Sequence, residues 1–425
     1  MTKIIRIPEK NVGYDEIINN FLSVVDTPEF QALRDRNQLD LIYKAVFPGA
    51  KHSVYEHSVG TLHHETNLID RIRKKRAYEF NEIESETAKI AALLHDIAKP
   101  PWSHAIEYVL MAYGEPSHDE KSIETLRRLK EKIKNIPSID FELLLKIFKE
   151  NHPLHQTIWG IIGSDVLDHV NRDADRCGVS VDSDANRIET HAYYDGKTYG
   201  ALTNVTEVII KHYDSHNFMY LEVYNRKVCS LIKGLIRRGV YEMIGVGKAV
   251  PSEIWDMTDD ELKFQMISAG GIAKDTYMKI RNRVLPHTFL TVKIEGYESR
   301  EEIGDKDIKI YELSEEELMK IVDYFRDINH VIEFEKELEK SLHLEPGDTV
   351  LAEMPHLDML RPKDINLYKP GSGWTSLFKE RPEYKETSNI NISRFYALRL
   401  GVSPEHRREA YRKSDVAFNA LCSLV

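Results

Sequence analysis

The chain has 425 residues, a formal net charge of −11 at pH 7, and 42% hydrophobic residues. This length is enough for one large core or two ordinary ones, and no run approaches the ~20 apolar residues that a membrane helix needs. The acidic balance argues against a nucleic-acid backbone as the main partner. Three cysteines without a CxxC spacing, and an N-terminus without an apolar signal core, predict a protein of the reducing cytoplasm.

Helices dominate the predicted elements, because apolar residues recur mainly at helical spacing. In chain order, the expected helices span residues 19–25, 28–41, 53–75, a run ending near 95, segments within 121–151, one around 165, 227–248, a run from 258, 314–344 and 404–425. Two of them have clear start signals: Thr27 precedes Pro28, and Thr258 stands three residues before Glu261 in a capping box.

Strands are predicted at fewer places, where β-branched and aromatic residues alternate between turn residues. The expected strands lie at 4–7, 206–213, 217–224, 285–297 and 348–355. The second and third would form a hairpin inserted into the helical body at about 189–224. The last two flank the long helix at 314–344 and indicate a smaller α+β domain over 285–425.

Two adjacent polar residues, His95 and Asp96, interrupt an otherwise apolar helical run that ends at Pro100 and Pro101. Polar side chains in a core helix need partners, because burying them unpaired is costly. A first-row divalent metal ion is one suitable partner, since neutral imidazole and carboxylate are good ligands for it. Taken alone, the pair favours a simple buried hydrogen bond over a metal site.

Motifs on both sides of this pair occur in the order of a known family. Residues 43–60 read YKAVFPGAKHSVYEHSVG, residues 95–104 read HDIAKPPWSH, and residues 161–179 read IIGSDVLDHVNRDADRCGV. A histidine, then His-Asp, then a distant aspartate resembles the HD-domain metal-dependent phosphohydrolases, and the motifs look most like their deoxynucleoside triphosphate triphosphohydrolase branch. The resemblance covers about 25–265. It implies a mainly α-helical fold with an HD-domain helical bundle over 1–284, carrying the hairpin insertion.

The resemblance also implies a single divalent ion, which could be Mn, Mg, Fe, Ni or Zn. Its implied ligands are His57, His95, Asp96 and Asp165, with Asp168 and Arg172 as structural partners. His118 becomes the candidate general acid or assistant to the nucleophile, and Asp119 its orienting partner. An unperturbed histidine titrates near pH 6.5, which suits proton transfer at neutral pH.

The implied substrate contacts come from several separated motifs. They are Gln38, Leu39, Lys99, His104, His169, Asp173, Arg237, Tyr241 and Lys248. In relatives the Gln-Leu pair lies beside the sugar and base, and the residue matching Asp173 lies near the sugar 3′-hydroxyl. This chain departs from the family pattern at Val54 and Val166, where phosphate-binding cations are usual, and at Lys99, where histidine is usual. Asp40 and His169 replace the family glycine and tyrosine.

Three functions follow as hypotheses. The first is hydrolysis of dNTPs to a deoxynucleoside and triphosphate by a metal-activated water, favoured by the run of matching motifs. The second is an HD-type nucleotidase or phosphodiesterase acting on monophosphate, cyclic or modified nucleotides, favoured by the altered substrate-facing positions. The third is a non-catalytic nucleotide-sensing regulatory protein, against which the intact ligand set argues. The family also implies a homo-oligomer, and no membrane association is expected.

Overall fold

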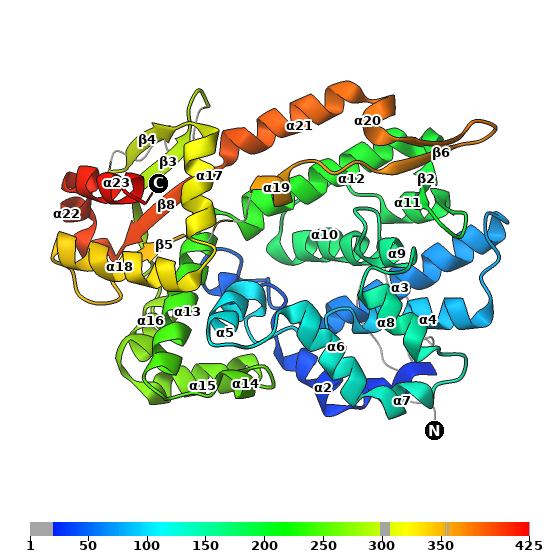
Figure 1. The fold of residues 1–425 in the computed structure, drawn as a ribbon, viewed down its shortest axis with the longest axis horizontal. Helices are drawn as coiled ribbons and strands as arrows, with labels where there is room; N and C mark the ends of the chain where they lie inside the picture. The colour runs from blue at the N-terminus through cyan, green and yellow to red at the C-terminus, as the bar shows by residue number, and fades with distance from the viewer. Residues whose placement is uncertain (1–19, 298–306, 353, 355–356, 425) are drawn as a thin grey trace.

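The structure is a computed structural model that describes residues 20–297, 307–352, 354 and 357–424. The described chain is mainly helical, with two four-stranded sheets placed toward opposite ends of the molecule (Figure 1). The strand expected at residues 4–7 lies outside the described residues. None of the described helices is both long and apolar enough to cross a membrane.

Four long helices form the framework around the site. They are α3 (Val54–Lys74), α4 (Glu82–Leu94), α10 (Ser164–Cys177) and α13 (Lys227–Gly245). Capping boxes start α3 at Ser53 and α4 at Asn81, so both first turns have satisfied amide groups. Helix α10 packs along α3 and ends at Gly178, whose φ of 68° gives the left-handed cap that glycine accommodates.

The other described helices pack around this framework and the two sheets. They are α1 (Leu22–Val25), α2 (Pro28–Ala32), α5 (Glu107–Ala112), α6 (His118–Arg128), α7 (Lys130–Lys134), α8 (Phe141–Phe148), α9 (His155–Trp159), α11 (Ala185–His191), α12 (Thr206–Met219), α14 (Pro251–Ile254), α15 (Asp259–Ala269), α16 (Gly271–Arg281), α17 (Glu315–Tyr324), α18 (Ile328–Leu342), α19 (Leu357–Leu360), α20 (Leu377–Glu380), α21 (Pro382–Phe395), α22 (Arg407–Arg412) and α23 (Ser414–Cys422).

The helix expected over residues 28–41 is much shorter than predicted. It starts as predicted, with the Thr27 hydroxyl accepting from the amide of Phe30, but α2 ends at Ala32 and one 3₁₀ turn follows. Beyond that turn, the backbone amide and side chain of Asn37 both donate to Asp259. Asp40 then adopts a φ of 43°, which an α-helix cannot contain.

The predicted hairpin of residues 206–213 and 217–224 is also wrong. The first run and part of the second form α12, and Tyr220–Tyr224 continues it as a π-helical turn. Ile209, Tyr213 and Met219 are buried, so tertiary packing of one helical face overrides the β propensity of these residues. The hairpin in this region is instead β1 (Ala192–Tyr194) with β2 (Tyr199–Leu202).

The first sheet has the order β1-β2-β6-β7, with β6 at Asn366–Lys369 and β7 at Gly373–Ser376. Strand β6 pairs parallel with β2 and antiparallel with β7. The chain therefore returns from its C-terminal region to complete a sheet that begins before residue 203. The predicted division at residue 284 stays a prediction, and this pairing crosses it.

The second sheet, of order β4-β3-β8-β5, forms the core of the C-terminal region. Its strands are β3 (His287–Ile294), β4 (Lys309–Leu313), β5 (Thr349–Leu351) and β8 (Ala397–Val402). Their apolar faces join a core that also includes α13 and the segment from Trp102 to Leu110. The long helix expected over 314–344 is two helices, because Asp327 caps the start of α18 after α17 has ended at Tyr324.

Candidate metal centre and adjoining cavity

Four predicted ligands from three parts of the chain lie together. His57 projects from α3, His95 and Asp96 directly follow α4, and Asp165 lies in the first turn of α10. His57 Nε2 lies 3.0 Å from His95 Nε2 and 3.1 Å from Asp165 Oδ1. His95 Nε2 lies 3.5 Å from Asp96 Oδ2 and 3.7 Å from Asp165 Oδ1. Donor atoms of His57, His95 and Asp96 all fall within 4.8 Å of one another.

The hydrogen bonds of the two imidazoles fit a metal ion. His95 Nδ1 lies 2.9 Å from the carbonyl oxygen of Ala92, which can only accept, so Nδ1 carries the hydrogen. His57 Nδ1 lies 2.8 Å from Asp168 Oδ2, the arrangement that orients metal-binding histidines. Both Nε2 lone pairs therefore point to one space that Asp165 also borders. With His57 neutral, two lone pairs and carboxylate oxygens at these distances would repel, so the arrangement requires either a cation between them or a proton on His57.

Asp168 is fixed in turn by a buried ion pair within α10. Arg172 donates to both of its oxygens, from Nε to Oδ2 and from Nη2 to Oδ1, each at 2.7 Å. The pair packs against Gly60 of α3, where an added Cβ would lie 2.6 Å from Asp168 Cγ. Glycine is therefore needed at this helix crossing. The structural role expected for Asp168 and Arg172 matches this geometry.

The charges of the clustered side chains favour a cation at this site. Burial opposes protonation of His57, but hydrogen bonds to Asp165 and Asp168 outweigh it and raise its pKa to about 10. Burial disfavours ionisation of Asp96, yet Lys99 and His95 hold its pKa well below the usual range. Burial likewise opposes ionisation of Asp165, but His57 and the other nearby histidines lower its pKa. The carboxylates thus stay ionised at neutral pH and can bind a divalent cation.

Lys99 lies at the edge of this cluster. Its Nζ is 2.8 Å from Asp96 Oδ2 and 3.4 Å from Gln38 Oε1, and the residue is buried. The lysine therefore contacts a candidate ligand directly, as well as lining the cavity beside it. A point charge here suits a phosphate oxygen.

His118, at the first position of α6, lies on the other side of Asp96. Its Nε2 is 3.6 Å from Asp96 Oδ1, and the same nitrogen is buried without a hydrogen-bond partner among the described residues. Burial opposes its protonation, but Asp119 and Asp96 raise the pKa of His118 to about 9. The residue is thus a cation at neutral pH. The Asp119 carboxylate lies 3.4 Å from Nδ1, but its side chain is 93% exposed. The partly buried Glu107 accepts from the His118 amide at 2.8 Å.

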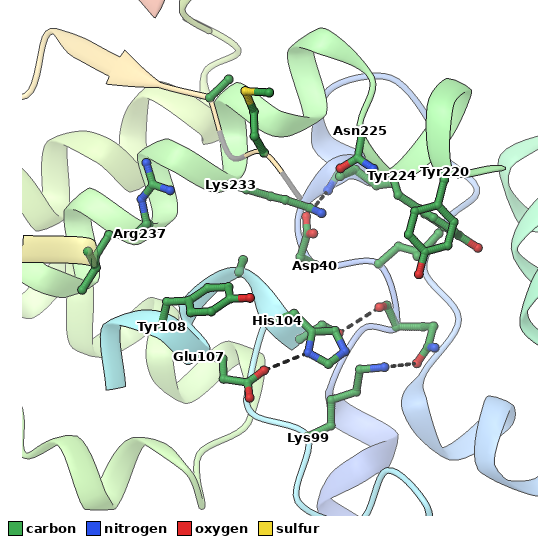
Figure 2. A pocket seen from close by; sticks show the side chains of 18 of the residues that line it. Asp40, Lys99, His104, Glu107, Tyr108, Tyr220, Tyr224, Asn225, Lys233 and Arg237 are labelled. Atoms are coloured by element: carbon green, nitrogen blue, oxygen red, sulfur yellow. Dashed lines mark hydrogen bonds and ion pairs between the residues drawn. The ribbon is translucent and has the colours of Figure 1, made fainter. Parts of the chain in front are cut away.

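A cavity of about 730 Å³ opens beside the cluster, a size typical of small-molecule sites. It is lined by His57, Asp96 and Asp165 and by predicted substrate contacts, which are Gln38, Leu39, Lys99, His104, His169, Asp173 and Arg237. Figure 2 shows Tyr220 and Tyr224 at one end of the view, Arg237 at the other, and Lys233 between them. Tyr241 and Lys248 are not among the lining residues: the Tyr241 hydroxyl donates to Asn329, and Lys248 is exposed.

One wall of the cavity carries a hydrogen-bonded chain centred on Asp173. His52 Nε2 lies 2.7 Å from Asp173 Oδ1, and the Tyr224 hydroxyl donates to Oδ2 at 2.6 Å. Tyr224 also lies 3.3 Å from His169 Nδ1. The sequence analysis missed Tyr220 and Tyr224, since it placed both in a strand. If residues 206–224 had been predicted as a helix, these two tyrosines would have been placed one turn apart on the same face.

Comparison with protein families agrees with this geometry. Residues 54–219 match the family model described as HD domain, and residues 215–324 match the one described as HD associated region. The first range contains all four clustered ligands, and the second contains Lys233 and Arg237.

The curated relatives are distant and longer. An uncharacterised protein of Methanocaldococcus jannaschii is 27% identical over 228 residues, which cover 52% of this chain and 46% of that protein. A deoxynucleoside triphosphate triphosphohydrolase SAMHD1 homologue of Dictyostelium discoideum is 27% identical over 235 residues, covering 51% and 46% respectively. The chain thus spans less than half of either relative.

Solved structures resemble the whole fold. A crystal structure of a phosphohydrolase from Bacteroides thetaiotaomicron matches 94% of this chain and all of that one, with a TM-score of 0.69 and 17% identity. A hypothetical protein from Aquifex aeolicus matches 97% of this chain and all of its own, with a TM-score of 0.67 and 21% identity. The expected mainly helical HD fold is confirmed.

Proposed function

We propose that this chain, an HD-domain protein with an HD-associated region, is a metal-dependent phosphohydrolase acting on (deoxy)nucleotides. The observation that carries the proposal is the convergence of His57, His95, Asp96 and Asp165 beside a cavity, with both imidazole Nδ1 atoms held by acceptors. Such a donor set suits one divalent ion among Mn, Mg, Fe, Ni and Zn.

Within this class, we infer that the reaction is hydrolysis of a dNTP to a deoxynucleoside and triphosphate. The similarity to a relative described as a deoxynucleoside triphosphate triphosphohydrolase supports this choice. So does the presence of Gln38, Leu39 and Asp173 along one cavity, where a sugar would be contacted.

A divalent ion at this site would supply an acidic bound water and would take up charge from the phosphate oxygens. The remaining steps belong to side chains of the chain itself. His118 is protonated at neutral pH and lies beside Asp96, so it can donate a proton to the leaving oxygen or bind a phosphate oxygen. Lys99 offsets the negative charge that develops next to Asp96.

A specific observation also favours the alternative of an HD-type nucleotidase or phosphodiesterase. Val54 is completely buried and Val166 nearly so, and Val54 does not line the cavity, so neither position supplies the phosphate-binding cation usual in the triphosphohydrolases. Lys99 and His118 could hold a single phosphate without them. Nucleotide sensing without catalysis is the third possibility, for which binding without turnover would be the signature.

The decisive experiment measures metal content and products together. Purified protein with Mn²⁺ or Mg²⁺ is incubated with each common nucleotide, and the products are identified by mass. Tripolyphosphate supports dNTP hydrolysis, whereas inorganic phosphate or a nucleoside monophosphate supports the alternative. His95→Ala and Asp165→Ala should each lower metal content and turnover by at least 100-fold. Wild-type activity in both variants would refute the site.

A further inference from the structure

The cavity has two chemically different ends. At one end lie the candidate metal ligands. The other end is built by the C-terminal region, from the turn between α17 and α18 and from strands β5 and β8. Its lining residues there are mainly apolar: Phe325, Ile328, Val331, Leu351, Ala352 and Leu398. Binding a phosphate group alone would not require an apolar surface, so the second end indicates that another group of the substrate binds there.

Arg237 of α13 lies where the two regions meet. Its Nη2 donates to the carbonyl oxygen of Leu351 at 2.9 Å and lies 3.7 Å from Glu335 Oε1. The residue is 8% exposed and lines the cavity, and its Nε has no hydrogen-bond partner among the described residues. A guanidinium has five N–H donors, so most of them are not used by these two contacts.

The charge of Arg237 is already balanced. Glu335 is completely buried, and its Oε2 also accepts from Arg238 Nη1 at 3.0 Å. Arg238 Nη2 contacts Glu339 at 3.3 Å and its Nε donates to Glu242 at 3.0 Å, so the two arginines face three carboxylates. Arg237 therefore offers hydrogen-bond donors without a net positive charge, which fits an uncharged acceptor better than a phosphate.

Lys233 lies one helical turn before Arg237 on the same face of α13 and also lines the cavity. Figure 2 shows its amine between Arg237 and the two tyrosines Tyr220 and Tyr224. A cation between the two ends suits an anionic or strongly polar link between a reacting phosphate and a distant uncharged group.

We propose that the apolar end of the cavity binds the non-reacting end of the substrate, an uncharged heteroaromatic group whose hydrogen-bond acceptor is bound by Arg237. The C-terminal region is then the part of the chain that selects the substrate. This inference rests on the proposed phosphohydrolase function, since it names the group attached to the reacting phosphate. It assigns Arg237 to that group, whereas the family resemblance implied only that Arg237 contacts the substrate.

The test is equilibrium binding, which needs no turnover. The four common 2′-deoxynucleosides and inorganic tripolyphosphate are titrated separately into the Mn²⁺-loaded full chain by calorimetry. At least one nucleoside should bind the wild type. Arg237→Lys, which keeps the charge but loses the forked donors, should weaken that binding by about 10- to 100-fold. Phe325→Ala, at a half-buried turn position, should weaken it by about 10-fold.

Arg281→Lys is the matched control, since Arg281 is exposed on α16 and lines no part of this cavity. It should leave nucleoside affinity at the wild-type value. The proposal is overturned if no nucleoside binds the wild type, or if both cavity variants bind nucleosides as tightly as it does. If nucleosides bind and the two cavity variants weaken that binding, but no nucleotide is turned over, this inference holds and the proposed function is refuted. If a nucleotide is turned over but the two cavity variants do not weaken nucleoside binding, the proposed function holds and this inference is refuted.

Discussion

Substituting Gly60 by alanine tests whether the α3–α10 crossing positions the metal ligands. The new Cβ would lie 2.6 Å from Asp168 Cγ and closer still to Asp168 Oδ1 and Arg172 Nη2. Carbon atoms in contact sit about 3.5 Å apart, so either the helices separate by about 1 Å or Asp168 leaves its place. Overpacking of this kind lowers the free energy of unfolding by about 1–3 kcal/mol. The higher helix propensity of alanine raises it by about 1 kcal/mol.

Displacement of Asp168 would remove the acceptor that orients His57 Nδ1. Loss of such a partner lowers metal affinity by about 10- to 100-fold. Calorimetric titration of Mn²⁺ measures that affinity, and urea unfolding measures the free energy of unfolding. Gly245→Ala is the control, because a Cβ there meets only the hydroxyl of Tyr113, at 3.0 Å. Wild-type Mn²⁺ affinity and stability in Gly60→Ala would refute the reasoning.

Two further predictions concern buried hydrogen-bonding groups. Burial raises the pKa of Glu65 to about 7, so its proton is bound more tightly in the folded chain than in the unfolded one, and stability falls as pH rises from about 4.5 through 7. The free energy of unfolding of Glu65→Gln, measured in urea relative to that of the wild type, should therefore rise by about 3 kcal/mol between pH 4 and pH 9. If this difference in free energy were the same at both pH values, the raised pKa of Glu65 would be contradicted. Tyr224→Phe removes the bond to Asp173 and should raise the KM for the nucleotide substrate about 3- to 10-fold in steady-state assays. Tyr311→Phe is the control: it loses an equivalent hydrogen bond, to Asp415, at residues that do not line the cavity, and should leave the KM unchanged.

The clustered residues could be named from the sequence, because a metal site would restrict both residue type and spacing. His57, His95, Asp96 and Asp165 could be named from their motifs, and the structure brings them together. Their arrangement needs only helices in the expected order, since each ligand sits near a helix end or on a helix with a clear start signal. The motif order thus carried information that local propensity does not.

The lining of the cavity could not be predicted equally well, because it depends on tertiary contacts. Tyr220 and Tyr224 were assigned to a strand on alternation alone, although helical packing places both at the cavity. Arg237 was correctly placed on a helix, but the carbonyl of Leu351, which binds it, lies more than a hundred residues away. Tyr241 and Lys248 do not line the cavity. The Tyr241 hydroxyl donates to Asn329 instead, and Lys248 lies after the end of α13 and is exposed.

The pairing of β2 with β6 affects how the protein can be divided and how it folds. A fragment ending near residue 284 would leave β2 with an unpaired edge, which invites association with other chains. The register Ala201↔Leu367 also closes a loop of more than 160 residues, so the sheet cannot be completed until nearly all of the polypeptide has left the ribosome. Expression trials should therefore keep residues 366–376 together with the half that carries the candidate metal ligands.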